Sequence, residues 1–212
     1  MQVFRWSLDI LCALKHLHGL DPIVMHRDLK PANILLARNH RTLKLADFGL
    51  AKRICRTEPG GKRRRHTCNV GTPQYGAPEV FAIPLAAADA GVYTEKADIY
   101  SAALIIWYLL TGRVPSTSVI AEPRARPDIG PAARRWPGMA ELVERMWVHD
   151  PEARPSAAEC AAVVRGLPLR AGLCGVGAAC RMLQNAVIRA SHSISSKPTP
   201  WPLKTASHLM TP

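Results

Sequence analysis

Apolar residues near the start of the chain recur at the spacing of an α-helix. From about Val3 to Leu17 they lie three or four positions apart, and Gly19 follows as a stop signal. This pattern predicts an amphipathic helix. A second helix is predicted from Lys96 to Leu110, where apolar residues lie on nearly every side, as in a helix that is buried all round. We expect the rest of the fold to pack around this second helix.

Two short apolar runs between these helices predict a small β-hairpin. The runs are Ile34–Leu36 and Leu43–Leu45, and the polar residues 38–41 between them are typical of a turn. Such a hairpin would place Asn33 and Asp47 close together on its flanking loops. Residues 51–71 are polar and basic without a sustained period, which predicts a mobile loop.

Two further helices are predicted over residues 141–148 and 157–164. Ser156 is the expected N-cap of the second helix, because Pro155 precedes it and Glu159 lies three residues further on, as in a capping box. Beyond Gly166 the sequence contains Gly, Ser, Pro and basic residues but no acidic ones, which predicts disorder. The pattern therefore predicts a mainly α domain over residues 1–167 and a basic, disordered tail over residues 168–212.

The charge of the chain has a simple interpretation. The 212 residues carry a formal net charge of +12, and 48% of them are hydrophobic, which is enough for one domain with its own core. A basic chain suits nucleic acid or an anionic membrane, but the charge here comes from local clusters such as residues 62–65, with no interleaved aromatic platforms. We interpret it as a solvated surface and expect neither a nucleic-acid nor a membrane partner.

The cysteines and the hydropathy pattern bear on the cellular location. The six cysteines show no C-x-x-C spacing, so we expect intracellular thiols rather than a zinc site or a disulfide framework. The longest apolar run, Ala102–Leu110, is far shorter than a membrane span, and the first residues lack the layout of a signal peptide. A cytoplasmic location is the prediction.

The candidate chemistry lies in three short motifs. Residues 26–33 read His-Arg-Asp-Leu-Lys-Pro-Ala-Asn, residues 47–49 read Asp-Phe-Gly, and residues 77–79 read Ala-Pro-Glu. The first two motifs supply two carboxylates, an ammonium group and an amide, which phosphoryl transfer requires. Each motif alone arises by chance, but the three together in this order do not. In this order and spacing, residues 1–167 resemble the C-terminal lobe of a eukaryotic-type protein kinase, which is helical with a small β-hairpin near the catalytic loop.

The resemblance implies roles for residues beside the transferred phosphate. Asp28 would be the base that accepts the proton of the substrate hydroxyl, and Lys30 would stabilise the moving phosphate. Thr72 would contact both of them, as in the serine/threonine kinases that the motifs resemble. Residues 95–111 and 147–156 are most similar to the tyrosine-kinase-like group of serine/threonine enzymes.

The resemblance also implies the cofactors ATP and Mg²⁺. Asn33 and Asp47 would hold Mg²⁺, a hard cation that prefers oxygen ligands. Leu35 matches the apolar residue that packs beneath the adenine of ATP in this family.

Five further residues match structural positions of the family. His26 and Phe48 match two members of the hydrophobic stack that supports the active state. Glu79 and Arg154 match a buried ion pair that fastens the substrate loop, and losing one member would strand a charge. Asp98 matches the residue on the central helix that hydrogen-bonds the backbone of the catalytic loop.

A regulatory hypothesis follows for Arg27. In relatives the equivalent arginine pairs with a phosphate on the activation loop and orders that loop. Thr67 lies twelve residues before Glu79, which is a typical offset for such a phosphate. The alternative is that Thr67 is an unmodified, solvated residue.

Two interpretations of the whole chain remain open. No glycine-rich phosphate loop and no Val-Ala-Ile-Lys type strand precede residue 26. We therefore expect an N-terminally truncated serine/threonine kinase that acts on protein substrates, needs the missing N-terminal lobe in cis, and has negligible activity alone. The alternative is a stand-alone, non-catalytic lobe that acts as a binding or decoy module. The enzyme is favoured because such a module has no need for the phosphoryl-transfer residues, which are all present: Asp28, Lys30, Asn33, Asp47 and Thr72.

Overall fold

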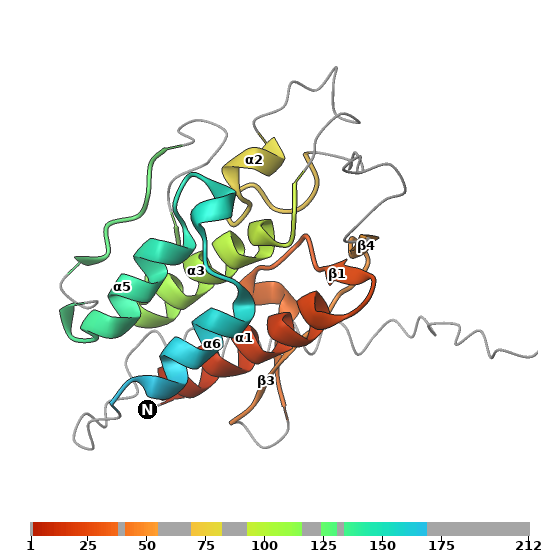
Figure 1. The fold of residues 1–212 in the computed structure, drawn as a ribbon. Coiled ribbons are helices and arrows are strands. Elements are labelled where there is room, and N and C mark those ends of the chain that lie inside the picture. The colour runs from red at the N-terminus through yellow and green to blue at the C-terminus, as the bar shows by residue number, and fades with distance from the viewer. Residues whose placement is uncertain are drawn as a thin grey trace, which may run out of the picture.

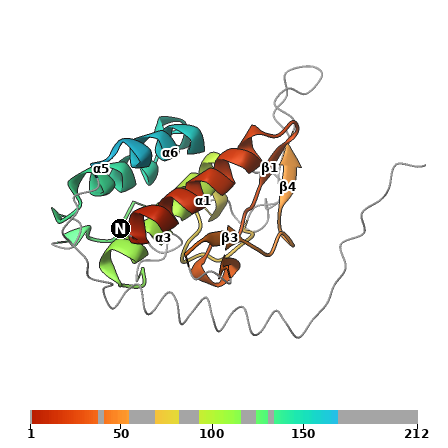
Figure 2. The same ribbon diagram turned by 90° about the horizontal axis from the view of Figure 1, so that it is seen from below.

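The fold is a set of helices packed around one central helix, with two small β-ladders at one side (Figures 1 and 2). A computed structural model describes residues 2–37, 41–54, 69–81, 93–115, 124–130 and 134–168. The helices, with the 3-10 turns marked η, are α1 Gln2–Gly19, η1 Pro31–Asn33, α2 Pro78–Phe81, α3 Lys96–Thr111, α5 Pro137–Met146, η3 Pro151–Ala153 and α6 Ala157–Gly166. The strands are β1 Ile23–Met25, β2 Ile34–Leu36, β3 Leu43–Leu45 and β4 Lys52–Ile54.

Helix α1 confirms the amphipathic helix that the sequence predicts. Its buried face includes Trp6, Ile10, Leu11 and Leu14, which recur every three or four residues. This face packs against α6 and α3, and Figure 2 shows α1 lying along both. The helix ends at Gly19, as the sequence indicates.

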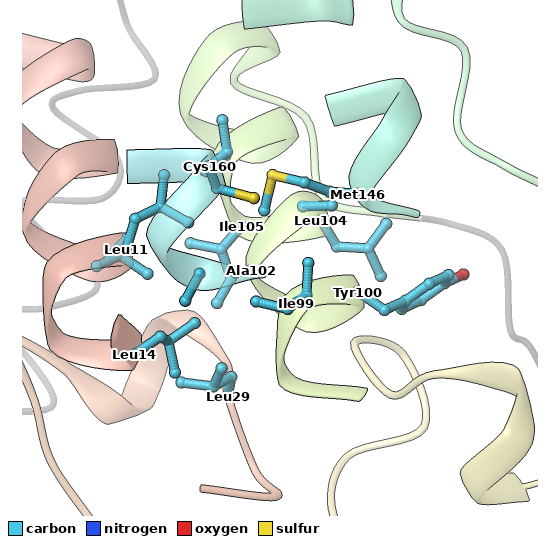
Figure 3. Packing of buried hydrophobic residues seen from close by; sticks show 14 of the residues in the cluster. Leu11, Leu14, Leu29, Ile99, Tyr100, Ala102, Leu104, Ile105, Met146 and Cys160 are labelled. Carbon is cyan, nitrogen blue, oxygen red and sulfur yellow. The ribbon is translucent and has the colours of Figure 1, made fainter. Parts of the chain in front are cut away.

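Helix α3 is the centre of the core and confirms the prediction of a helix buried all round. Every residue from Ala97 to Leu110 is buried. Figure 3 shows side chains of α3 meeting Leu11 and Leu14 of α1, Met146 of α5 and Cys160 of α6. The helix stops at Gly112, whose left-handed φ of 73° allows its N–H to bond the carbonyl of Tyr108 at 2.9 Å.

The predicted hairpin is also confirmed. Strands β2 and β3 pair antiparallel, with Ile34 opposite Leu45 and Leu36 opposite Leu43. Helix α1 holds the hairpin, because Asp9 Oδ2 accepts the N–H of Leu43 at 2.9 Å. Residues 38–40 of the turn lie outside the described residues.

The prediction of a loop over residues 51–71 is wrong at its start. Residues Lys52–Ile54 form β4, which pairs antiparallel with β1, and Ile54 lies opposite Ile23. A strand of three residues is too short to show a period-2 pattern, and its partner lies about thirty residues earlier in the sequence. Residues 55–68 of the predicted loop lie outside the described residues.

The two C-terminal helices form where the sequence predicts helices, with different bounds at α5. Helix α5 begins at Pro137 and ends at Met146, not over residues 141–148. Pro137 at the first helical turn is a start signal, since its fixed φ suits that position and its missing N–H would have no intrahelical partner. Helix α6 begins after Ser156, as predicted, and extends to Gly166.

The Ser156 capping box gives a first testable prediction. Ser156 Oγ accepts the N–H of Glu159 at 3.2 Å, and Glu159 Oε2 accepts the N–H of Ser156 at 2.7 Å. We expect Ser156→Ala to destabilise the protein by about 1 kcal/mol, since the N–H of Glu159 loses its acceptor. Thermal melting of Ser156→Ala should show a midpoint about 2–4 °C below that of the unmodified chain. Ser156→Thr keeps the hydroxyl and serves as the control; equal melting of both variants would contradict the prediction.

The predicted fold class is confirmed: the described chain is mainly α, with a small hairpin next to residues 26–33. Apart from Pro168, the predicted tail over residues 168–212 lies outside the described residues. Within the described ranges, no helix is both long enough and apolar enough to cross a membrane.

Candidate active site

A buried carboxylate holds the loop of residues 26–33 to the central helix. Asp98, in the first turn of α3, is 2% exposed. Its Oδ2 accepts the backbone N–H of His26 at 2.9 Å, and its Oδ1 accepts the backbone N–H of Arg27 at 3.0 Å. His18, from the end of α1, places its Nε2 3.0 Å from Asp98 Oδ2. Asp98 thus ties the loop both to α3 and to α1.

These contacts change the acidity of Asp98. Burial alone would raise the pKa of its carboxyl group. The hydrogen bond and charge of His18, together with the two backbone N–H groups, outweigh burial, so the pKa lies below its usual value of 3.8. Asp98 is therefore ionised at neutral pH.

Asp98 gives a prediction for acid unfolding. Its folded-state pKa is lowered, so its ionised form stabilises the fold above the unfolded pKa of about 4, and this contribution is lost as pH falls through the folded pKa. We expect Asp98→Asn to be less stable at pH 7 and to lose less stability than the unmodified chain on acidification below pH 4. Urea unfolding at a series of pH values measures this difference. Asp128→Asn, at an exposed position, is the control; parallel stability profiles for Asp98→Asn and the unmodified chain would contradict the prediction.

A second carboxylate, Asp28, is the centre of a polar cluster made by two distant segments. Lys30 Nζ lies 2.7 Å from Asp28 Oδ2, and Asn33 Nδ2 donates to the same oxygen at 3.0 Å. Thr72, which lies 44 residues away in sequence, donates its hydroxyl to Asp28 Oδ1 at 2.8 Å. Lys30 Nζ also donates to Thr72 Oγ1 at 3.0 Å. The structure thus brings Asp28, Lys30, Asn33 and Thr72 into direct contact.

The cluster keeps Asp28 ionised. Its burial would raise the pKa of the carboxyl group, but the hydrogen bonds of Lys30, Thr72 and Asn33 and the charge of Lys30 lower that pKa by more. The net effect is a pKa below the usual 3.8. Asp28 at neutral pH is therefore a carboxylate whose position is set by three donors.

Gly71 allows the segment of Thr72 to approach the loop of Asp28. Its φ is +101°, and a Cβ at this position would come within 2.5 Å of the carbonyl oxygen of Arg27. Any other residue would meet both backbone strain and this close contact. Gly71 therefore positions the Thr72 hydroxyl against Asp28.

The hairpin places Asp47 beside Asn33, as the sequence predicts. The N–H of Ala46 donates to the carbonyl of Asn33 at 2.9 Å, so Asp47 follows directly after this contact. Asp47 has a left-handed φ of 60° and is exposed, and its Oδ1 accepts the N–H of Gly49 at 3.2 Å. Asn33 directly precedes β2, and Asp47 lies two residues after β3. Their side-chain oxygens therefore come from the two residues that flank the strands of one hairpin.

The apolar residues that follow Asp47 are partly packed and partly exposed to solvent. The ring of Phe48 lies 5.0 Å from that of His26, and His26 Nε2 is hydrogen-bonded to the carbonyl of Ala46 at 3.0 Å. Phe48 and Leu50 nevertheless remain 37% and 41% exposed. Leu35 lies on β2 and is half-buried. An apolar surface is therefore present next to the hairpin.

The oxygen atoms near the hairpin suit a magnesium ion bound together with phosphates. Asn33 uses its Nδ2 as a donor to Asp28, and a metal would be bound by its other side-chain atom, the carbonyl oxygen. Asp47 supplies an exposed carboxylate. In the described ranges there is no group of three or more His, Cys, Asp or Glu side chains that could hold a metal by itself. Mg²⁺ commonly binds to one or two protein oxygens plus substrate phosphates, so this donor set fits Mg²⁺ with ATP.

Glu79 and Arg154 form a bidentate ion pair next to the first residue of α3, Lys96, whose carbonyl also accepts a hydrogen bond from Arg154 at 3.0 Å. Arg154 Nη1 lies 2.6 Å from Glu79 Oε1, and Nη2 lies 2.9 Å from Oε2. Arg154 is 1% exposed, and its guanidinium also stacks over the ring of Tyr100 at 5.1 Å. The pair fixes α2, and with it the segment that carries Thr72, to the turn before α6.

Of the two residues in the regulatory hypothesis, the structure describes only Arg27. Arg27 has a left-handed φ of 70°, and its guanidinium lies 5.5 Å from the ring centre of Tyr93. Thr67, the proposed phosphate acceptor, lies outside the described residues.

Two positioning residues were missed from sequence. His18 contacts Asp98 across 80 positions in the chain, and a histidine in the last turn of a helix carries no signal of such a partner. Gly71, directly before Thr72, lies outside the three motifs, and nothing in them indicates its close approach to the backbone of Arg27.

Comparison with known proteins identifies relatives. The model of the protein kinase domain matches residues 2–163. The probable serine/threonine-protein kinase drkC of Dictyostelium discoideum is 33% identical over 158 residues, which cover 71% of this chain and 19% of that protein. The serine/threonine-protein kinase STY46 of Arabidopsis thaliana is 33% identical over 165 residues, which cover 74% of this chain and 26% of that protein.

A third relative carries a different specificity in its name. The seven transmembrane domain-containing tyrosine-protein kinase 1 of Dictyostelium discoideum is 35% identical over 166 residues, which cover 73% of this chain and 22% of that protein. The chain thus spans between 19% and 26% of the length of these three curated relatives.

Proposed function

The chain belongs to the protein kinase family, and on this premise we propose that residues 1–167 form the C-terminal lobe of a serine/threonine kinase. This enzyme transfers the γ-phosphate of ATP to hydroxyl groups of protein substrates. The observation that supports the proposal most directly is the cluster in which Asp28 accepts hydrogen bonds from Lys30, Asn33 and Thr72. Ionised and fixed in place, Asp28 has the properties that a base for a substrate hydroxyl needs.

Each member of the cluster has a part in the proposed mechanism. Asp28 accepts the proton of the substrate hydroxyl as its oxygen attacks the γ-phosphate. The ammonium of Lys30, 2.7 Å from Asp28, neutralises negative charge on the moving phosphate. Thr72 keeps both side chains in register through its hydroxyl. Asn33 and Asp47 would hold Mg²⁺, and a metal bound there together with ATP would supply positive charge to the phosphates.

The serine/threonine specificity rests on Thr72 and Lys30. In the resemblance stated above, these two residues are features of serine/threonine kinases, and two of the relatives named above are called serine/threonine kinases. A third relative is called a tyrosine kinase, so the acceptor must be identified by experiment.

We further propose that activity needs an N-terminal lobe in cis. The 212 residues contain no glycine-rich phosphate loop before residue 26, and the exposed Phe48 and Leu50 offer an apolar surface against which such a lobe would pack. The alternative function, a non-catalytic binding module, uses the same fold without phosphate transfer.

One experiment tests both points. The 212-residue chain is joined behind the N-terminal lobe of STY46, and both this fusion and the chain alone are given labelled MgATP and peptides containing Ser, Thr or Tyr. We expect the fusion to label Ser and Thr peptides and the chain alone to label none. Labelling of Tyr peptides only would overturn the specificity. A folded fusion that binds MgATP but transfers nothing would favour the non-catalytic module.

Two predictions from sequence stay proposals. Phosphorylated Thr67 docking on Arg27 would order the activation loop that carries Thr67, and an unchanged rate for Thr67→Ala in the active fusion would contradict this idea. The cytoplasmic location is tested by cell fractionation. Cys12 and Cys160, the free thiols in the described ranges, agree with a reducing compartment.

A further inference from the structure

A cavity of about 310 Å³ lies behind the catalytic loop, where the end of α1 meets the beginnings of α3 and α6. It is lined by side chains such as Lys15, His18, Glu95 and Lys96, and by none of the Asp28 cluster. We propose that this cavity binds the phosphate group of a small phosphomonoester. The inference does not depend on the proposed kinase activity.

Two ammonium groups supply the positive charge. Lys15 is exposed at the cavity wall and has no hydrogen-bond or ion-pair partner among the described residues. Lys96 Nζ donates one hydrogen bond to the carbonyl of Arg154 and has two further N–H groups to offer. Lys15 and Lys96 thus line one concave site from different helices, and two lysines at one site can hold a phosphate as point charges.

The volume of the cavity and the apolar residues in its wall indicate a phosphate ester rather than phosphate alone. A volume of about 310 Å³ is at the lower end of the range for small-molecule sites and exceeds what one phosphate fills. Ile99 and Ala157 give the wall an apolar part, against which a small organic group can pack.

One lining group opposes an anion. Glu95 contributes a carboxylate to the wall, and it makes no side-chain cap bond although it precedes α3. Lys15, Lys96 and Glu95 together give the lining a formal charge of +1, apart from His18. Removing the carboxylate should therefore tighten binding of a phosphate, whereas removing Lys15 should weaken it.

A ligand in the cavity would lie close to the hydrogen bonds that hold the catalytic loop, residues 26–33, in place. His18 forms part of the wall, and its Nε2 lies 3.0 Å from Asp98 Oδ2. Asp98 in turn accepts the backbone N–H groups of His26 and Arg27. A ligand that touches the His18 ring is thus two hydrogen bonds from the catalytic loop.

The test is a titration of the full 212-residue chain with inorganic phosphate and, separately, with phenyl phosphate. NMR signals of the imidazole rings report where binding occurs, because His18 lines the cavity and the exposed His16 on the same helix does not. We expect saturable shifts of the His18 signals. Lys15→Met should weaken binding about fivefold and Glu95→Gln should strengthen it about threefold, as for the loss of one partly exposed charge interaction. Lys44→Met, at an exposed position on β3, should leave binding unchanged.

The outcomes separate the sources of the phosphate. Tighter binding of phenyl phosphate than of inorganic phosphate assigns the cavity to an ester, and equal binding overturns the ester in favour of free phosphate. Shifts that do not saturate, that affect His16 and His18 alike, or that respond equally to Lys15→Met and Lys44→Met would overturn the proposal, since they indicate only condensation of anions on a basic surface. Circular dichroism of each variant confirms that the fold is retained.

Discussion

Asp28→Asn is expected to lower the kcat of the active fusion about 10²–10⁴-fold, which is the usual contribution of a positioned general base. The carboxylate is the only member of its cluster that is basic enough to accept the proton of a substrate hydroxyl. Lys30 and Thr72 both donate hydrogen bonds within the cluster, and Lys30 has no acceptor. Measurement of kcat with a saturating peptide substrate reports this loss.

The substitution should leave the fold intact. Asp28 Oδ2 accepts hydrogen bonds from Lys30 and Asn33. The amide introduced by Asp28→Asn can place its oxygen at the same position and keep both contacts. The amide nitrogen then faces Thr72, whose hydroxyl can rotate to accept a hydrogen bond instead of donating one. We expect a similar melting midpoint and a large loss of rate.

Asp128→Asn makes the same chemical change at an exposed position and is the control. Its own contact can persist, because Asp128 Oδ1 accepts the N–H of Gly130 and an amide oxygen can do the same. A rate for Asp28→Asn within threefold of this control would show that Asp28 is not the base.

The helices were predictable from sequence because each carries a local signal. The helix at Gln2–Gly19 shows one apolar stripe, and Lys96–Thr111 is apolar on all sides. The Ser156 and Glu159 capping box is a four-residue pattern, and the structure contains both of its hydrogen bonds. Such signals depend only on neighbours within a turn or two, so no knowledge of the tertiary structure was needed.

The pairing of β1 with β4 could not be predicted in the same way. Each strand has three residues, and neither Ile23–Met25 nor Lys52–Ile54 shows alternation over a useful length. What stabilises them is their contact with each other, and a pattern within one segment does not report a partner elsewhere in the chain. The same reason explains why the structure was needed to show the contact of His18 with Asp98.

The candidate site was predictable where a motif records long-range contacts. Thr72 and Asp28 are 44 positions apart, yet the structure brings them within 2.8 Å. Composition or periodicity alone would not indicate this contact, and it was expected only through the resemblance to a family. Gly71 lies outside the quoted motifs, and its role is visible only from its φ of +101° and its distance to Arg27.

Arg154→Met is expected to destabilise the protein by about 3–5 kcal/mol, because it leaves the carboxylate of Glu79 without its buried partner. The guanidinium makes two bonds to Glu79 and further bonds to the carbonyls of Val148, Lys96 and His149. Methionine fills part of the volume but can donate to none of these acceptors. Thermal melting should show a midpoint lowered by about 6–20 °C, at about 2–4 °C for each kcal/mol in a chain of this size.

A double-mutant cycle separates the ion pair from the rest of the contacts. Glu79→Gln keeps an acceptor oxygen for the Arg154 guanidinium, so we expect it to cost less than Arg154→Met. In the double variant, part of the loss should be recovered, because no unpaired carboxylate remains beside the methionine side chain. Arg165→Met, which changes an exposed arginine of α6, is the matched control and should alter stability by no more than about 0.5 kcal/mol. A melting midpoint for Arg154→Met within about 2 °C of this control would show that the ion pair with Glu79 does not stabilise the attachment of α2 to the turn before α6.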